Sequence, residues 1–227
     1  MGYGTILSPL LLIAGFSPLE VVPAILLSQA MGGFSASLFH HKQGNVNFGA
    51  KTHDSKVVYV ITSFGVVATI AAVFIAVNIS RVAVKTYIGA LVLLMGLIML
   101  SGYSFRFSFK KMVFVGLISA FNKGMSGGGF GPVVTGGQII SGQHHKSAIG
   151  VTTMAEAPIC IVGFLTYMLT KGITDWSIVA VLSVGAILAT PLGAITTKRI
   201  GDRYLKLILG LLVAVLGAWT LLKVWVF

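Results

Sequence analysis

The sequence predicts an all-α, polytopic membrane protein built from two repeats of inverted topology. Of its 227 residues, 56% are hydrophobic and 9% are charged, and its mean hydropathy is +0.97, more than a soluble core requires. The first half of the chain also resembles the second, and three of its apolar segments are too short to span a bilayer. The alternating pattern of a membrane β-barrel does not appear, so we expect helices.

The two halves match at fixed spacings. At an offset of 127 residues, Gly2-Tyr3-Gly4 reappears as Gly129-Phe130-Gly131, and Gln29 corresponds to Glu156. At an offset of 121 residues a second set recurs: Ile79, Lys85, Gly89, Gly96 and Leu100 as Ile200, Lys206, Gly210, Gly217 and Leu221. A doubled apolar chain is typical of transporters whose binding site lies where the repeats meet.

Nine apolar segments make up most of the chain. The first repeat, residues 1–104, contains segments 5–16, 19–40, 57–78 and 82–101. The second repeat, residues 105–227, contains segments 111–123, 129–141, 146–169, 175–197 and 203–225. A spanning helix needs roughly 20 apolar residues. Segments 5–16, 111–123 and 129–141 are shorter, and short, broken helices that meet near the bilayer midplane indicate a transporter's binding site.

The basic residues set the expected orientation, because cytoplasmic loops carry an excess of lysine and arginine. With loops 41–56, 102–111, 142–146 and 198–204 in the cytoplasm, 11 of the 16 lysines and arginines lie inside when Lys206 is counted with the last loop, four lie outside, and Lys123 lies within the membrane. The loop before segment 57–78 is then inside, whereas the matching loop around Lys171 is outside. This orientation inverts one repeat relative to the other and places the C-terminus outside.

The same orientation explains the short segments. Segment 111–123 enters from the cytoplasm, breaks at the glycine-rich residues 124–129, and returns as segment 129–141. The break therefore lies near the midplane. By inversion, segment 5–16 runs from the midplane to the outer face, with Gly2 at its inner tip. Its partner, a descending arm, would precede Met1.

Glycine-rich backbone at the midplane predicts an anion site. Glycine permits close approach and positive φ angles, and a helix start presents unpaired N–H groups and a positive dipole end. Two such starts that converge from opposite sides suit a small oxyanion. The alternative is that the glycines only allow helices to pack closely. The expected substrate contacts are Gly2, Tyr3, Gly4 and Thr5 together with Ser126, Gly127, Gly128, Gly129, Phe130 and Gly131.

Polar side chains within the apolar segments extend this site. Lys123, beside Asn122, would add positive charge, and Gln29 stands in the first repeat where Glu156 stands in the second. An ionisable group at this depth costs about 3 kcal/mol and marks a functional site. We expect Glu156 to take up and release the coupling proton; the alternative is a salt bridge with Lys123 that only joins the repeats. Two residues on the helix face of Glu156 complete the expected substrate contacts, Thr152 and Thr153.

Other classes of function are disfavoured. The net charge of +11 comes from the ends of apolar segments, where it sets topology, so we expect no nucleic-acid binding. The sequence has no nucleotide-binding loop, so an ATP-driven pump would need another subunit. It also has no Ser-His-Asp order or zinc-helix signature, so we expect no enzyme. The single cysteine, Cys160, is expected to be a small buried residue, and the pairs His40-His41 and His144-His145 offer no third metal ligand. We therefore expect no metal and no cofactor.

The glycine stretches and their surroundings carry a family resemblance. They read GYGTILSPL at residues 2–10 and GGGFGPVVT at residues 127–135, and the helix after the second begins with AIGVTT at residues 148–153. This doubled pattern resembles the sulfite exporter TauE/SafE family over essentially the whole chain. The family pattern also includes an apolar segment ahead of the first glycine motif, which would precede Met1. The resemblance implies an exporter of sulfite, organosulfonates or related sulfur oxyanions in the cytoplasmic membrane.

These observations predict a secondary active transporter in the cell membrane that works by alternating access. Its expected partners are a small sulfur oxyanion and the lipid bilayer, and the sequence is compatible with a homo-oligomer. Two alternatives stand beside this prediction. The same helix starts could line an anion channel, or the protein could be a membrane anion sensor that does not transport. The sequence names neither the anion nor the coupling ion.

Overall fold

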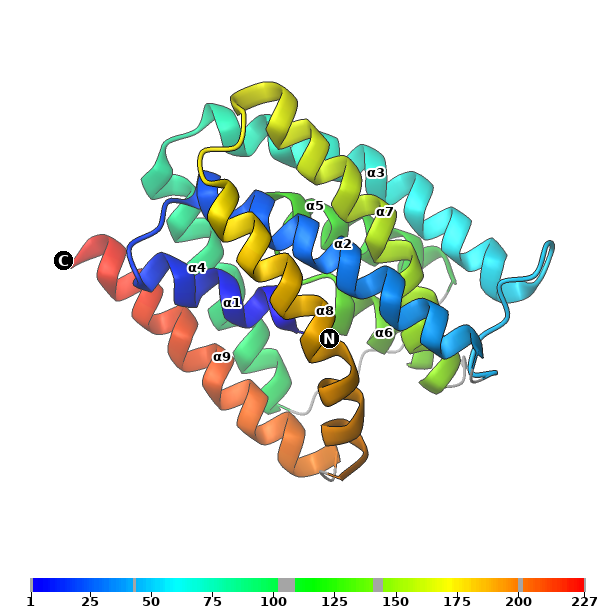
Figure 1. Ribbon diagram of the computed structural model, residues 1–227. Helices are drawn as coiled ribbons and strands as arrows, with labels where there is room; N and C mark the ends of the chain where they lie inside the picture. The colour runs from blue at the N-terminus through cyan, green and yellow to red at the C-terminus, as the bar shows by residue number, and fades with distance from the viewer. Residues whose placement is uncertain (1, 43, 102–108, 141–144, 200–201, 227) are drawn as a thin grey trace.

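The computed structural model describes residues 2–42, 44–101, 109–140, 145–199 and 202–226, which form helices joined by short loops (Figure 1). All nine predicted segments are helices, which confirms the all-α prediction. Their bounds are α1 Tyr3–Ile13, α2 Pro18–Lys42, α3 His53–Asn78, α4 Arg81–Ser101, α5 Phe109–Ser126, α6 Gly131–Ile140, α7 His145–Lys171, α8 Trp176–Arg199 and α9 Asp202–Trp225. Helices α2, α3, α4, α7 and α9 are long and apolar enough to cross a membrane, as a polytopic membrane protein requires.

Local chemistry explains where several helices begin. The side-chain oxygen of Thr52 accepts a hydrogen bond from the Ser55 N–H at 3.3 Å and so caps α3. Pro18 occupies the first position of α2, where its missing N–H has no intrahelical partner to lose. Gly2 precedes α1 with a φ of +84°, a left-handed conformation that glycine adopts without steric cost.

Helices α4 and α9 pack against each other and run antiparallel (Figure 1). A Cβ atom on Gly89 would lie 3.0 Å from the Leu221 side chain, and one on Gly210 would lie 3.1 Å from the Leu100 side chain. The sequence match pairs Gly89 with Gly210 and Leu100 with Leu221. The second contact is therefore the first with the two halves exchanged.

Two further glycines of the same interface show this reciprocity. A Cβ atom on Gly96 would lie 2.6 Å from the Cα of Ala214, and one on Gly217 would lie 2.7 Å from the Cα of Leu93. Ala214 follows Leu93 by 121 residues, the offset that also separates the two glycines. Contacts that recur on exchange of the partners are typical of a two-fold relation. The division of the chain at residue 104 stays a prediction.

Helices α2 and α7 lie side by side at the centre of the molecule and also run antiparallel (Figure 1). Late in α2, Ser37 contacts Met154 in the first half of α7 at 3.5 Å. Early in α2, Leu26 packs on Gly163 in the second half of α7. In addition, α2 packs against α8 and α7 packs against α3. Because α3 and α8 hold matching places in the two halves, this arrangement too keeps its form when the halves are exchanged.

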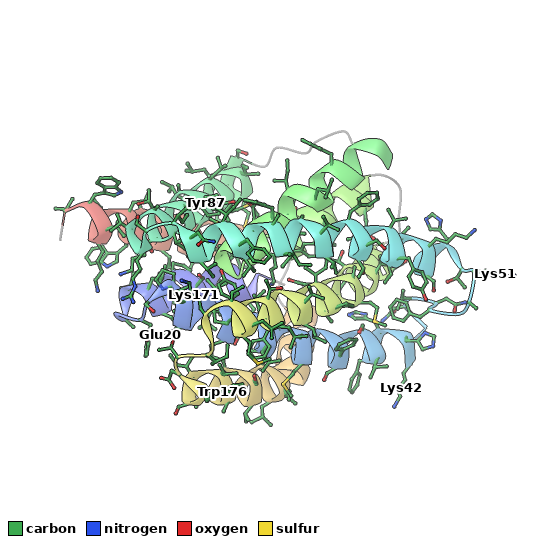
Figure 2. The ribbon with its side chains drawn as sticks, turned by 90° about the horizontal axis from the view of Figure 1, so that it is seen from above. Glu20, Lys42, Lys51, Tyr87, Lys171 and Trp176 are labelled. Atoms are coloured by element: carbon green, nitrogen blue, oxygen red, sulfur yellow. The ribbon has the colours of Figure 1, made fainter. Side chains whose placement is uncertain are left out.

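The two ends of the helix bundle carry different loops. Figure 2 shows Lys42 and Lys51 at one end of the molecule, and Glu20, Lys171 and Trp176 at the opposite end. This is the separation that the predicted topology requires of loop 41–56 and the loop around Lys171. Which end faces the cytoplasm stays a prediction.

Candidate functional site

The starts of α1 and α6 meet in the interior of the molecule. A Cβ atom on Gly128 would lie 2.8 Å from the backbone nitrogen of Thr5, and one on Gly4 would overlap the carbonyl oxygen of Gly127. The Gly129 N–H donates to Thr5 Oγ1 at 3.1 Å, and all five residues are buried. The absence of side chains permits this approach of two backbones. The fold thus brings together the two glycine stretches that the sequence analysis singled out.

The break between α5 and α6 has its own hydrogen bonds. Gly127 and Gly129 adopt φ angles of +73° and +82°, which residues with a Cβ rarely do. The Gly127 N–H donates to the Lys123 carbonyl at 2.8 Å and ends α5. The Gly128 N–H donates to Ser126 Oγ at 3.1 Å. The Gly128 and Gly129 N–H groups are thus both bonded to hydroxyls, which an oxyanion would have to displace in order to bind there.

A buried ion pair lies beside the point where the backbones at the starts of α1 and α6 meet, called the backbone crossing below. Lys123 Nζ lies 2.5 Å from Glu156 Oε1, and the two side chains are 1% and 13% exposed. The same ammonium group donates to Gln29 Oε1. That oxygen is close to the crossing, because a Cβ atom on Gly4 would lie 3.1 Å from it. The predicted counterparts Gln29 and Glu156, from α2 and α7, therefore bind one lysine from α5.

Two further side chains lie near this lysine. Cys160, one turn after Glu156 on α7, is fully buried as the sequence predicted, and it lies close enough to Lys123 to interact with its charge. Tyr3 also lies within reach of that charge, and its hydroxyl accepts a hydrogen bond from Ser28 Oγ at 3.3 Å. Sequence reasoning missed Ser28, although it directly precedes Gln29 in an apolar segment.

Two tyrosines hold the end of α5 at the break, and neither was among the predicted site residues. Tyr87 of α4 donates to Asn122 Oδ1, and Tyr167 of α7 donates to the Gly124 carbonyl at 2.9 Å. The Asn122 carbonyl accepts from Ser126 Oγ at 2.7 Å. A tyrosine within a long apolar segment is the signal that could have identified them, because a buried phenol requires a hydrogen-bond partner.

The two predicted threonines of α7 are bonded to other groups. Thr152 Oγ1 accepts from Thr135 Oγ1 at 2.9 Å and from Gln138 Nε2 at 2.7 Å. Thr153 Oγ1 donates to the carbonyls of Ile149 and Gly150 in its own helix, each at 3.0 Å. Thr152 therefore belongs to a polar cluster between α6 and α7 that sequence reasoning did not foresee.

Phe130 packs in the hydrophobic core. It is fully buried in one apolar cluster with Val57, Ile61 and Val134. Gly131 is the first residue of α6, so these two residues lie where the break ends and the helix begins. In the structure, the Phe130 ring thus anchors the start of α6 to α3.

The chemistry of the site suits an anion. In the described part of the chain, no three His, Cys, Asp or Glu side chains are grouped to hold a metal ion. The site instead offers a fixed ammonium group, an amide and two adjoining helix starts. Ammonium groups and N–H groups at helix starts bind oxyanions, and the Glu156 carboxylate lies beside this ammonium group.

An all-helical membrane fold in which two short helices start at one interior point is typical of a membrane transporter. The chain belongs to the sulfite exporter TauE/SafE family, whose sequence profile matches residues 1–220. It is 25% identical over 241 residues to the "Probable membrane transporter protein YtnM" of Bacillus subtilis (strain 168), with 100% of this chain and 78% of that relative covered. No solved structure gives a significant match. The expected family and the class of membrane transporter are thus confirmed.

Proposed function

We propose that this protein exports a small sulfur-containing oxyanion, such as sulfite or an organosulfonate, by secondary active transport with alternating access, and that the transport is coupled to protons. The family and the printed name of the relative support a membrane transporter. The substrate class rests on the family, and the observation that carries the coupling is the contact between Lys123 Nζ and Glu156 Oε1.

An oxyanion and the Glu156 carboxylate compete for one ammonium group in this proposal. Lys123 is 1% exposed, so its charge is balanced by the groups it touches and not by solvent. An oxyanion that reaches Lys123 can replace the carboxylate as its partner. The released Glu156 then carries an uncompensated charge at membrane depth, and protonation removes that charge. Binding of the anion therefore favours binding of a proton, and the two move together. Export follows when the outward gradient of the anion exceeds the inward gradient of protons.

The arrangement of the helices supports alternating access. The starts of α1 and α6 reach the same place from different halves, and the α4–α9 contacts recur when the halves are exchanged. In transporters with inverted repeats, one half rocks against the other around a central site, so that each face opens in turn. The site at Lys123 lies where such a motion would leave the bound anion in place.

The orientation and partners belong to the same proposal. Loops 41–56, 102–111, 142–146 and 198–204 face the cytoplasm and the C-terminus faces outside, as the basic residues indicate. The protein moves its substrate without altering it, so it is not an enzyme. The proposed partners are the small sulfur oxyanion and the lipid bilayer, and a homo-oligomer is compatible with this proposal.

A thermal-shift panel of small anions tests the site and the substrate class together. Ligand binding to the folded state raises stability by about 2.7 kcal/mol at 100 times Kd. We expect a sulfur oxyanion to stabilise the wild type and the control Lys85→Ala, but not Lys123→Ala. An equal shift in Lys123→Ala, or a preference for chloride over all sulfur oxyanions, would contradict the proposal.

Flux through liposomes separates transport from the two alternatives. A coupled transporter moves the anion against its concentration gradient when a pH gradient is imposed, whereas a channel moves it only downhill. A sensor gives the thermal shift without flux. We expect uphill movement.

A further inference from the structure

The polar cluster between α6 and α7 lies one helical turn from the ion pair. Gln138 Nε2 donates to Thr152 Oγ1 at 2.7 Å and to the Val134 carbonyl at 3.3 Å, and Thr135 Oγ1 donates to Thr152 Oγ1 at 2.9 Å. Gln138 and Thr152 are 0% exposed, and Thr135 is 5% exposed. On α7, Glu156 follows Thr152 by four residues, so their side chains share one face of the helix.

One atom of this cluster lacks a partner. The side-chain oxygen of Gln138, Oε1, is buried and makes no hydrogen bond to the residues that the structure describes. In this orientation the amide NH2 group meets the Val134 carbonyl, whereas the reverse orientation would place the oxygen against that carbonyl, and two acceptors repel. An unpaired acceptor inside a membrane protein is unfavourable. Such an atom is explained when a ligand supplies the missing donor.

We propose that Gln138 determines specificity by accepting a hydrogen bond from a hydroxyl or amino group on the transported oxyanion. This inference rests on the proposed function, in which the anionic group of the same molecule binds at Lys123. Gln138 and Lys123 contact Thr152 and Glu156, which are about 6 Å apart along α7. A sulfonate that carries a hydroxyl or amino group on a two-carbon chain is of this length.

Selection by this oxygen follows from desolvation. A donor on the substrate would satisfy Oε1, whereas a methyl group in its place would leave the oxygen buried and unpaired. Sites built to hydrogen-bond a substrate reject analogues without the bonding group far more strongly than apolar pockets reject a change of size. Gln138 therefore favours donor-bearing oxyanions over simple ones of equal charge.

Two sulfonates of equal charge and similar size test this inference on the full chain in detergent. The probes are 2-hydroxyethanesulfonate and propane-1-sulfonate, and the measured quantity is the ratio of their Kd values. We expect the wild type to bind the hydroxylated probe at least about ten-fold more tightly, and Gln138→Leu to lower this ratio to about one. Ser183→Ala is the control, because Ser183 Oγ is another buried atom without a partner, on α8, and it should keep the wild-type ratio.

Each outcome decides between the inference and the proposed function. Equal Kd values in the wild type, or an unchanged ratio in Gln138→Leu, overturn the inference alone. Binding of sulfite without either alkanesulfonate also overturns it and leaves the proposed function standing. Binding of no sulfur oxyanion overturns both. Should Gln138→Leu fail to fold, Thr152→Val replaces it, since loss of the hydroxyl that positions the amide should lower the ratio as well.

Discussion

Lys123 Nζ on α5 lies 2.5 Å from Glu156 Oε1 on α7. The same nitrogen donates to Gln29 on α2, the residue that the sequence match pairs with Glu156 at an offset of 127. Two positions related by the predicted repeat thus meet at one atom, which places that atom near the axis relating the halves. Of the two partners only Glu156 can ionise, so the two halves differ in charge at this pair of matching positions.

Removal of the lysine should destabilise the fold. Lys123→Met leaves the Glu156 carboxylate without its counter-charge, and loss of one member of a buried pair costs about 3–5 kcal/mol. Adding Glu156→Gln removes that charge, so the double variant should be less destabilised than Lys123→Met alone. Thermal unfolding of the four proteins of this double-mutant cycle measures the coupling. Simple additivity would show that the two side chains do not interact energetically.

The backbone crossing should not tolerate a methyl group. The Cβ of Gly128→Ala would lie 2.8 Å from the Thr5 nitrogen, and overpacking of this kind costs about 1–3 kcal/mol. Gly116→Ala on α5 is the matched control, because a Cβ there has no atom within 4 Å, and it should gain up to about 1 kcal/mol in helix propensity. Unfolding in detergent compares them. Equal effects would argue against the close approach of α1 to α6.

Substitutions in the contact between α4 and α9 should destabilise the protein equally whichever of the two helices carries them. Gly96→Ala and Gly217→Ala each press a methyl group onto the facing backbone, so each should lower the free energy of unfolding by about 1–3 kcal/mol. Gly185→Ala on α8, with open space around its Cβ, should be nearly neutral. A large loss in the free energy of unfolding of one variant, with none in the other, would contradict the reciprocal packing.

The two ends of the bundle should react with membrane-impermeant thiol reagents from different sides. Cys160 is the single native cysteine, so Cys160→Ser gives a background without thiols. In intact cells we expect Lys171→Cys to be labelled and Lys51→Cys to be protected until the membrane is permeabilised. The reverse pattern would refute the orientation, and labelling of both positions from outside would refute the separation of the ends.

The apolar segments of the sequence predicted where each described helix lies, but they did not include the polar residues at some helix ends. Segment 57–78 becomes α3 from His53, because Thr52 caps a first turn of polar residues that carries no apolar signal. Segment 111–123 becomes α5, which continues to Ser126. The chain leaves the helix at Gly127, where φ turns positive, and the sequence alone does not show which of several glycines does so.

The centre of the site was predictable because charge within an apolar segment is rare. Lys123 and Glu156 are charged residues deep within apolar segments, where such residues are rare. They could therefore be identified without knowing how the helices are rotated. The bonds of Tyr87 to Asn122 and of Gln138 to Thr152 depend on which face each helix turns to its neighbour. That rotation is set by packing between helices far apart in the sequence, so a single sequence could not reveal these pairs.

Uphill transport in liposomes tests most directly whether a bound anion replaces the Glu156 carboxylate as the partner of Lys123. A pH gradient is imposed across liposomes that hold equal concentrations of an organosulfonate on both sides, and its distribution is followed for the wild type, Glu156→Gln and the surface control Glu20→Gln. We expect the wild type and Glu20→Gln to accumulate the anion in the alkaline compartment, since protons moving there carry it along, whereas Glu156→Gln should let it equilibrate without accumulation. Undiminished accumulation by Glu156→Gln would contradict the proposal that this carboxylate couples protons to the anion.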